Sequence, residues 1–329
     1  MREPERKVSR AFNQVKIYSD IGVAIKTSSK MNKIRAEANW YRTIPNELKG
    51  FAPKFIELIP DSEELSLVMD YYPFQNLSEI LLEGQDVDWT HILIRLLKVH
   101  KHFVDASKKY HKSSLPSKED LVKFHIEKLT ERVGALHKTS LWWTSLMGEK
   151  TITINGIEMK NLDYSTLVEC IEYGKEYAIP SVVHGDYCFS NILYDTKTDC
   201  VKLVDPRGSF ALNNTYSIFG DAQYDFAKLM HSFWGGYDLI LGEQYFMPEG
   251  VPMARPLFEL RIPENFQIAR SMLYTSLMDK PVKERRYIIA LHCSLFWSMI
   301  PLHYEDFKRQ FAFYLRAVQL YNELLEHLD

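Results

Sequence analysis

The first quarter of the chain alternates short apolar runs with polar turns, a pattern that predicts β-strands. Four of these runs pair into two hairpins, at residues 14–18 with 22–26 and 55–59 with 65–69. Between the hairpins, residues 32–43 have the apolar spacing of a helix, and Pro45 ends it because proline disfavours helical backbone in the preceding residue. The sequence therefore predicts a small β-rich region that carries one helix.

From residue 76 onward, apolar positions recur mainly at three- and four-residue steps, which predicts helices. The expected helices are residues 77–82, 91–107, 118–136, 164–177, 221–234 and 304–328. A hairpin is expected to interrupt them at 151–158, where Asn155-Gly156 is a strong turn signal between alternating Ile and Thr residues. The second part of the chain is therefore predicted to be mainly helical.

The change between the two patterns falls at residues 70–73, where a Tyr-Tyr-Pro turn follows the last predicted strand. We place a hinge there, with an N-terminal lobe at 1–73 and a C-terminal lobe at 74–329. With 329 residues and 46% hydrophobic content, the chain is long and apolar enough to build a large core.

Composition and charge exclude several function classes. The net charge is −3 and no run of Lys or Arg is long enough to cover a face of the protein, so a nucleic-acid partner is not expected. The N-terminus lacks the apolar stretch of a signal peptide and no apolar run is long enough to span a bilayer, so we expect a soluble, cytoplasmic protein. The four cysteines show no metal-ligand spacing and are expected to be free thiols.

The strongest chemical signal lies in residues 182–193, where four residues separate Asp186 from Asn191. A second carboxylate, Asp205, follows the apolar strand predicted at 201–204. An Asp and an Asn at this separation can share one tight loop, with Asp186 facing a substrate hydroxyl while Asn191 and Asp205 bind Mg²⁺ through oxygen. The spacing therefore indicates a phosphotransferase active site.

Each of these three residues also has a structural explanation. Asp186 could cap a turn, Asn191 could satisfy backbone groups in its loop, and Asp205 could begin the Asp-Pro-Arg-Gly turn. Their joint occurrence at the ends of three short apolar strands favours the functional interpretation.

These motifs resemble the catalytic loop of the aminoglycoside phosphotransferase and choline kinase superfamily, and the resemblance covers most of the chain. Protein kinases have His-Arg-Asp and Asp-Phe-Gly at these places, whereas this chain has His-Gly-Asp at 184–186 and Asp-Pro-Arg-Gly at 205–208. The resemblance implies an α+β, two-lobed protein-kinase-like fold, with a small β-rich N-terminal lobe and a large, mainly helical C-terminal lobe.

The same resemblance implies an ATP-dependent, Mg²⁺-requiring phosphotransferase. Its acceptor would be a hydroxyl of a small molecule, such as a sugar, an amino sugar or an amino alcohol like choline. Two alternatives stay open, a non-catalytic nucleotide-binding protein with a kinase-like fold and, less well supported, a protein kinase. The acceptor, the choice between ATP and GTP, and the oligomeric state are not determined by the sequence.

The resemblance also assigns residues to the nucleotide. Lys26, at the end of an apolar strand, would pair with the phosphates and be held by Glu37 on the following helix, with Lys30 and Lys33 as competitors for the role of Lys26. The loop at 9–13, expected to cover the phosphates, contains no glycine.

Further residues are assigned by position. Backbone groups at Asp70 and Tyr72 would receive the adenine. Arg207 could reach phosphate or pair with a nearby carboxylate, and both readings stay open. His184 is expected to be a structural residue of the loop.

A second shared signature, Gly-Asp-Ala-Gln-Tyr-Asp-Phe-Ala at 220–227, resembles the family's helix start. Asp221 is expected to cap that helix, and Asp225 to reach back to the amides of the catalytic loop.

Overall fold

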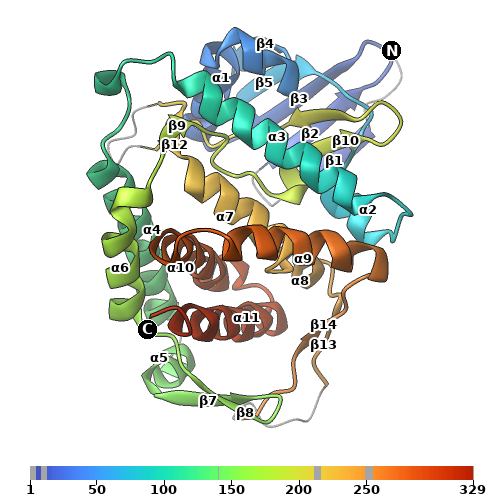
Figure 1. The fold of residues 1–329 in the computed structure, drawn as a ribbon. Helices are drawn as coiled ribbons and strands as arrows, with labels where there is room; N and C mark the ends of the chain where they lie inside the picture. Colours follow the sequence, from blue (N-terminus) through green and yellow to red (C-terminus); the bar gives the residue numbers. More distant parts are fainter. Residues whose placement is uncertain (1–4, 9–12, 140, 211–215, 249–254, 329) are drawn as a thin grey trace. The chain divides into compact units, whose positions relative to one another are not determined.

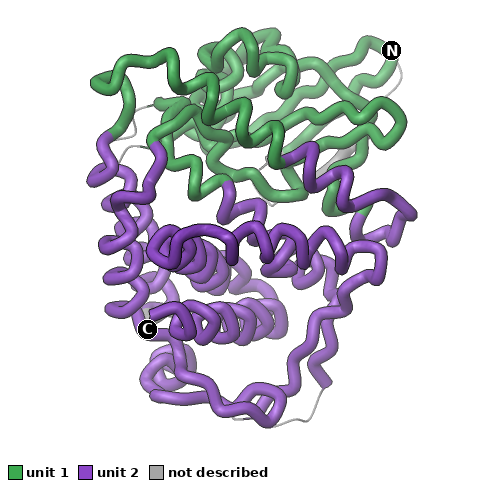
Figure 2. Tube along the Cα trace, viewed as in Figure 1, with its two compact units in different colours: residues 1–80, 97–116, 180–225 green, residues 81–96, 117–179, 226–329 purple. Residues whose placement is uncertain are grey.

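The computed structural model describes residues 5–8, 13–139, 141–210, 216–248 and 255–328. Its contacts divide the chain into two compact units (Figure 2). Unit 1 comprises residues 1–80, 97–116 and 180–225, and unit 2 comprises residues 81–96, 117–179 and 226–329. The units interleave along the sequence, and the lobe boundary at residue 73 stays a prediction.

Unit 1 contains a five-stranded antiparallel sheet (Figure 1), in the order β1-β2-β3-β5-β4. Its strands are β1 (Glu5–Val8), β2 (Asn13–Tyr18), β3 (Val23–Ser28), β4 (Phe55–Pro60) and β5 (Leu65–Asp70). In β3 buried and half-buried residues alternate, as expected for a strand with one face toward the core. This alternation puts Lys26 on the buried face together with Ala24.

Helix α1 (Met31–Thr43) packs on this sheet through strands β3, β4 and β5. Its buried residues include Ile34, Glu37, Ala38 and Tyr41, whose three- and four-residue spacing makes one continuous stripe. Glu37 is the only charged side chain buried in the helix. A buried carboxylate is costly without a partner, so its position points to a compensating cation.

Besides the C-terminal half of helix α3 (Trp89–Ser107), the remainder of unit 1 consists mainly of short strands and 3₁₀ turns that support loops. Two small sheets have the orders β11-β10-β6 and β12-β9. Their strands are β6 (Gln75–Asn76), β9 (Pro180–Val182), β10 (Ile192–Asp195), β11 (Cys200–Leu203) and β12 (Phe219–Asp221). The 3₁₀ turns are η1 (Asn46–Phe51), η2 (Lys112–Ser114) and η4 (Phe189–Asn191).

Unit 2 is mainly helical and has two added hairpins, β7 with β8 and β13 with β14. The remaining helices of the chain are α2 (Leu77–Leu82), α3 (Trp89–Ser107), α4 (Lys118–Thr139), α5 (Leu141–Gly148), α6 (Tyr164–Tyr173), α7 (Ala222–Phe233), α8 (Tyr237–Leu241), α9 (Glu264–Met278), α10 (Val282–Met299) and α11 (Phe307–Leu325). The remaining short elements are β7 (Thr151–Ile154), β8 (Ile157–Lys160), β13 (Tyr245–Phe246), β14 (Glu259–Leu260), η3 (Gly174–Tyr177) and η5 (Ile300–His303). No helix among the described residues is both long and apolar enough to cross a membrane.

The structure confirms most of the predicted elements, including the hairpins of the first 70 residues and the hairpin at Asn155-Gly156. Several predicted helix boundaries are wrong by one to four residues, and two of these differences have a clear local cause. The helix expected at 164–177 ends at Tyr173 and continues as a 3₁₀ turn, and the last helix begins at Phe307 because Asp306 caps it through the amide of Arg309. Helices α5, α8, α9 and α10 were not predicted.

Candidate active site

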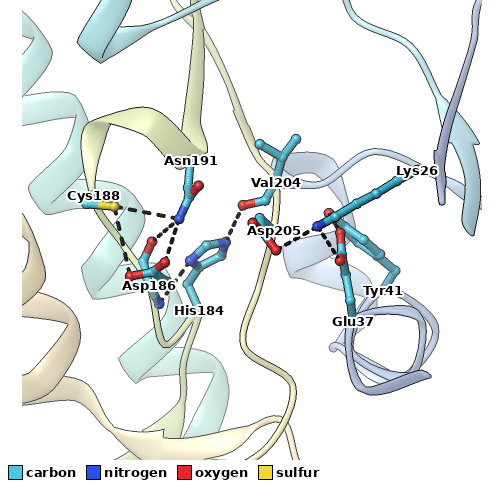
Figure 3. A network of polar contacts seen from close by, with 9 residues as sticks. All are labelled: Lys26, Glu37, Tyr41, His184, Asp186, Cys188, Asn191, Val204 and Asp205. Atoms are coloured by element: carbon cyan, nitrogen blue, oxygen red, sulfur yellow. Dashed lines mark hydrogen bonds and ion pairs between the residues drawn. The ribbon is translucent and has the colours of Figure 1, made fainter. Parts of the chain in front are cut away.

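Lys26 and Glu37 form a buried ion pair at the core of unit 1. The ammonium of Lys26 donates to Glu37 Oε2 at 2.7 Å and to Asp205 Oδ1 at 2.7 Å (Figure 3). Lys26 and Glu37 are 6% and 2% exposed, whereas nearly half of the Asp205 side chain is exposed, 48%. The ammonium has three N–H groups, and among the described residues two of them bond these carboxylates, so the third can meet an incoming acceptor.

Burial and charge act in opposite directions on this pair. Burial works to lower the pKa of Lys26, but the charges of Glu37 and Asp205 outweigh it and raise that pKa above its usual value. Burial raises the pKa of Glu37 to about 7, although Lys26 acts to lower it. Lys26 is therefore charged throughout the physiological pH range. Its charge keeps the pKa of Glu37 lower than burial alone would make it.

Asp186 and Asn191 lie on the loop between β9 and β10, and they contact each other directly. The amide nitrogen of Asn191 donates to Asp186 Oδ2 at 3.0 Å and to the carbonyl of Asp186 at 2.9 Å. Because both partners accept hydrogen bonds only, the amide nitrogen must face Asp186, and the Asn191 oxygen is turned away as a possible metal ligand. Cys188 Sγ lies 3.9 Å from Asp186 Oδ1 and 3.6 Å from the Asn191 amide nitrogen.

His184 is a buried, neutral member of this loop, 1% exposed. Its Nδ1 accepts from the amide of Asp186 at 3.3 Å, so the proton sits on Nε2, which faces the carbonyl of Val204 at 3.1 Å. Burial lowers the pKa of His184 to about 4, against the smaller opposing effect of Asp186 and Asp205. The ring thus joins the catalytic loop to the end of β11 and is not available as a base.

The buried imidazole makes stability sensitive to acid. The unfolded chain binds a proton at this position below about pH 6.5, but the folded chain binds it only near pH 4, so acid favours unfolding within that window. Between about pH 7.5 and about pH 5, we expect the free energy of unfolding of wild type to fall by about 2 kcal/mol more than that of His184→Gln. Urea denaturation at both pH values measures the difference.

Asp225 has the opposite effect on the pH dependence of stability. Burial raises its pKa to about 7, so the folded chain binds this proton more readily than the unfolded chain does. Asp225 titrates in both proteins, so the comparison between them isolates His184. The exposed His91→Gln is the matched control and should follow wild type. An unchanged pH dependence in His184→Gln would contradict the assignment of a buried, neutral ring.

Asp205 and the turn after it have an unusual backbone. Asp205 has φ +56°, a left-handed conformation that costs a non-glycine residue about 1–3 kcal/mol and occurs most often at functional sites. Arg207 donates its amide to the carbonyl of His184 at 2.9 Å, and its guanidinium donates to the carbonyl of Ser209 at 3.1 Å. These contacts direct the Arg207 side chain toward Ser209 and Phe210 of its own segment. They therefore favour neither phosphate binding nor pairing with a carboxylate, its two predicted roles.

Asp221 and Asp225 lie where the second signature suggested. Asp221 Oδ1 accepts from the amide of Gln223 at 3.0 Å at the start of α7. The carboxylate of Asp225 accepts from the amides of His184 and Gly185, each at 2.7 Å. Both amides are buried, and leaving either unpaired would cost about 1–3 kcal/mol, so Asp225 fixes the shape of the loop that precedes Asp186.

At the predicted hinge, the amides of Asp70 and Tyr71 are already engaged, with the carbonyls of Lys54 and Gly22. The amide of Tyr72 makes no backbone hydrogen bond among the described residues and is the remaining candidate donor for a purine. The ammonium of Lys202 lies 4.5 Å from the centroid of the Tyr72 ring. Residues 9–12 of the loop expected over the phosphates lie outside the described residues.

Three contacts of the site were not anticipated from the sequence. Trp40 of α1 bonds the backbone just before His184, the backbone of Gly208 meets that of α1, and the Phe210 ring fills the space beside Gly185. An alanine at Gly185 would put its Cβ 2.2 Å from that ring. No local sequence pattern predicts these contacts, because each joins segments that are far apart in the sequence.

No protein-family profile matches the sequence, and a search of curated proteins gives no match. Solved structures match over nearly the whole chain. A thermostable mutant of aminoglycoside phosphotransferase APH(4)-Ia, in a ternary complex with AMP-PNP and hygromycin B, matches with a TM-score of 0.60 and 10% identity over 97% of this chain and 93% of that chain.

The crystal structure of a protein from Haemophilus somnus 129PT that is assigned as a fructosamine-3-kinase matches with a TM-score of 0.55 and 12% identity, over 98% of this chain and 91% of that chain. The chain therefore has the fold of these kinases. This confirms the predicted α+β, kinase-like fold and the resemblance on which it was based, at the level of the fold.

Proposed function

We propose that this protein transfers the γ-phosphate of ATP to a hydroxyl group of a small molecule. The observation that carries the proposal is that Lys26, Glu37 and Asp205 form one ion cluster, and that His184 links the end of β11 to the loop of Asp186 and Asn191. A cation for phosphate, oxygen ligands for a metal and a carboxylate base are the groups that phosphoryl transfer requires.

Asp186 is proposed to orient the acceptor hydroxyl and accept its proton. Its carboxylate is only half-buried, and it is held on one side by the Asn191 amide. A half-buried carboxylate whose rotamer is fixed by hydrogen bonds can receive a hydroxyl group without a change of that rotamer. On this proposal Asp186 acts at the acceptor oxygen, and Lys26 acts at the phosphates through its remaining N–H group.

The residues present suit Mg²⁺. Asp205 and Asn191 offer hard oxygen ligands, and the half-exposed Asp205 carboxylate lies near the buried carboxylate of Glu37, with Lys26 as the main opposing charge and Lys33 as a weaker one. No group of three His, Cys, Asp or Glu side chains suited to a metal occurs in the described part of the chain, but Mg²⁺ bound by one Asp, one Asn, phosphates and water needs none. When bound, this ion would neutralise charge developing on the phosphoryl oxygens.

A small acceptor is favoured over a protein. Ser209 pairs with Tyr216, and β12 begins at Phe219, so the segment after Asp-Pro-Arg-Gly is short where protein kinases have a long activation loop. We propose a sugar, an amino sugar or an amino alcohol as the acceptor. The solved neighbour with hygromycin B makes an amino sugar antibiotic a reasonable first probe.

The test is incubation with MgATP and a metabolite extract, supplemented with hygromycin B and choline, followed by mass spectrometry. We expect one new phosphorylated compound with wild type and with the control variant Asp195→Asn, and none with Asp186→Asn. Phosphate found only on added proteins or on the chain itself would favour the protein-kinase alternative. Mg²⁺-dependent ATP binding without any product across the extract would favour the non-catalytic alternative.

A further inference from the structure

Trp40 is a fully buried residue of α1 that bonds the main chain of the catalytic loop. Its indole N–H donates to the carbonyl of Val183 at 2.7 Å, across 143 positions of sequence. Its ring also meets the ring of His184 edge-on, with centroids 5.6 Å apart, and stacks on Phe103 at 6.1 Å. Val183 is the residue immediately before His184, so the bond acts where the catalytic loop begins.

The same helix carries Glu37, three positions earlier. Residues four apart lie on one face of a helix, so Glu37 and Tyr41 share one face while Ala36 and Trp40 share the adjacent one. The first face receives Lys26, and the second receives the catalytic loop and the turn after Asp205. One rigid helix thus touches both groups of proposed site residues.

A second contact on the Ala36 face joins helix α1 to the turn after Asp205. A Cβ at Gly208 would lie 2.1 Å from the carbonyl oxygen of Ala36, so the two backbones meet directly. Gly208 is connected through Arg207, whose amide bonds the carbonyl of His184, back to the loop that Trp40 bonds. Helix α1, the catalytic loop and the Asp205 turn therefore each contact the other two, so a shift of one disturbs its contacts with both others.

We infer that Trp40 is a positioning residue, which holds the Lys26–Glu37 pair and the Asp186 loop in a fixed mutual arrangement. The inference rests on the proposed function, since it assigns the two groups to phosphate and acceptor. Phosphoryl transfer depends on in-line placement of those two partners, so a small rotation of α1 relative to the loop lowers the rate. Nucleotide affinity should respond much less, because the contacts of Lys26 with Glu37 and Asp205 do not involve Trp40.

The substitution that separates these effects is Trp40→Phe, which keeps an aromatic ring and removes the N–H donor. Its matched control is Trp297→Phe, because Trp297 is buried and its indole N–H has no acceptor among the described residues. Both substitutions remove the same atoms from a buried site, but only the first removes a hydrogen bond. Circular dichroism sets an assay temperature at which both variants stay folded.

The first measurement is hydrogen exchange of the free protein, which needs no substrate. The amides of His184 and Gly185 bond Asp225 and should be protected in wild type. In Trp40→Phe we expect peptides covering 183–191 to exchange about tenfold faster, the equivalent of one lost buried hydrogen bond, and Trp297→Phe to leave them unchanged. Equal exchange of this segment in the two variants would overturn the inference.

The second measurement is steady-state kinetics with the acceptor found above. Trp40→Phe should lower kcat by about ten- to a hundredfold while KM for ATP changes by less than about threefold, and Trp297→Phe should change neither. Unchanged kcat, or kcat and KM for ATP impaired alike, would overturn the inference. A wild-type protein that transfers no phosphate would defeat the proposed function instead, and the exchange experiment would then decide the coupling by itself.

Discussion

Replacing Asp186 by Asn is expected to reduce phosphoryl transfer by about a hundred- to ten-thousand-fold, the usual contribution of a positioned general base. The amide has nearly the shape of the carboxylate but cannot accept the proton of the acceptor hydroxyl. The substitution leaves Lys26, Glu37 and Asp205 in place, and these are the groups proposed to hold the phosphates and the metal, so nucleotide binding should persist. Kinetics with the identified acceptor and calorimetric titration with MgATP measure the two effects separately.

Two further variants make this expectation specific. Asp195→Asn alters a half-buried residue at the end of β10 whose carboxylate accepts from Lys197 and Thr198 of its own turn, and it should behave as wild type. Asp205→Asn removes a proposed Mg²⁺ ligand and a partner of Lys26, so it should weaken Mg²⁺-dependent nucleotide binding, which Asp186→Asn does not. Turnover by Asp186→Asn at the wild-type rate would remove Asp186 from the role of base.

The sequence predicted well whatever is encoded by local periodicity. The stripe of Ile34, Glu37, Ala38 and Tyr41 repeats at helical spacing, and the hairpin turn at 19–22 separates two clear strands. Helix α10 was missed for the converse reason. Every residue from Tyr287 to Met299 is buried, so the helix has no polar face and no periodic signal.

The candidate site likewise contains residues that the sequence predicted and contacts that it did not. Asp186, Asn191 and Asp205 were predicted because they occupy adjacent short elements, whose spacing in sequence limits their spacing in space. The bond between Trp40 and Val183 and the close approach of Gly208 to Ala36 are tertiary contacts between a helix and distant loops. Their existence depends on how α1 packs, which no window of the sequence contains.

The contact between Gly208 and α1 leads to the second large expected effect. Gly208 has φ +62°, and an alanine there would bring its Cβ to 2.1 Å from the carbonyl oxygen and 2.4 Å from the carbonyl carbon of Ala36. Backbone cannot rotate away as a side chain can, so either α1 or the Asp205 turn must move. We expect Gly208→Ala to lower the free energy of unfolding by roughly 2–5 kcal/mol, the sum of left-handed strain and overpacking.

Gly84→Ala separates the two contributions, because Gly84 has φ +65° and open space where its Cβ would lie. That variant should lose only the strain, about 1–2 kcal/mol. Unlike the loss of the Trp40 hydrogen bond, this overlap forces either Glu37 on α1 or Asp205 on its turn away from Lys26, so Gly208→Ala should also lose nucleotide affinity, which Gly84→Ala should keep. Urea denaturation and MgATP titration of both variants measure these effects. If Gly208→Ala proved as stable as Gly84→Ala and bound nucleotide equally well, α1 would not need the Asp205 turn to hold Glu37 against Lys26.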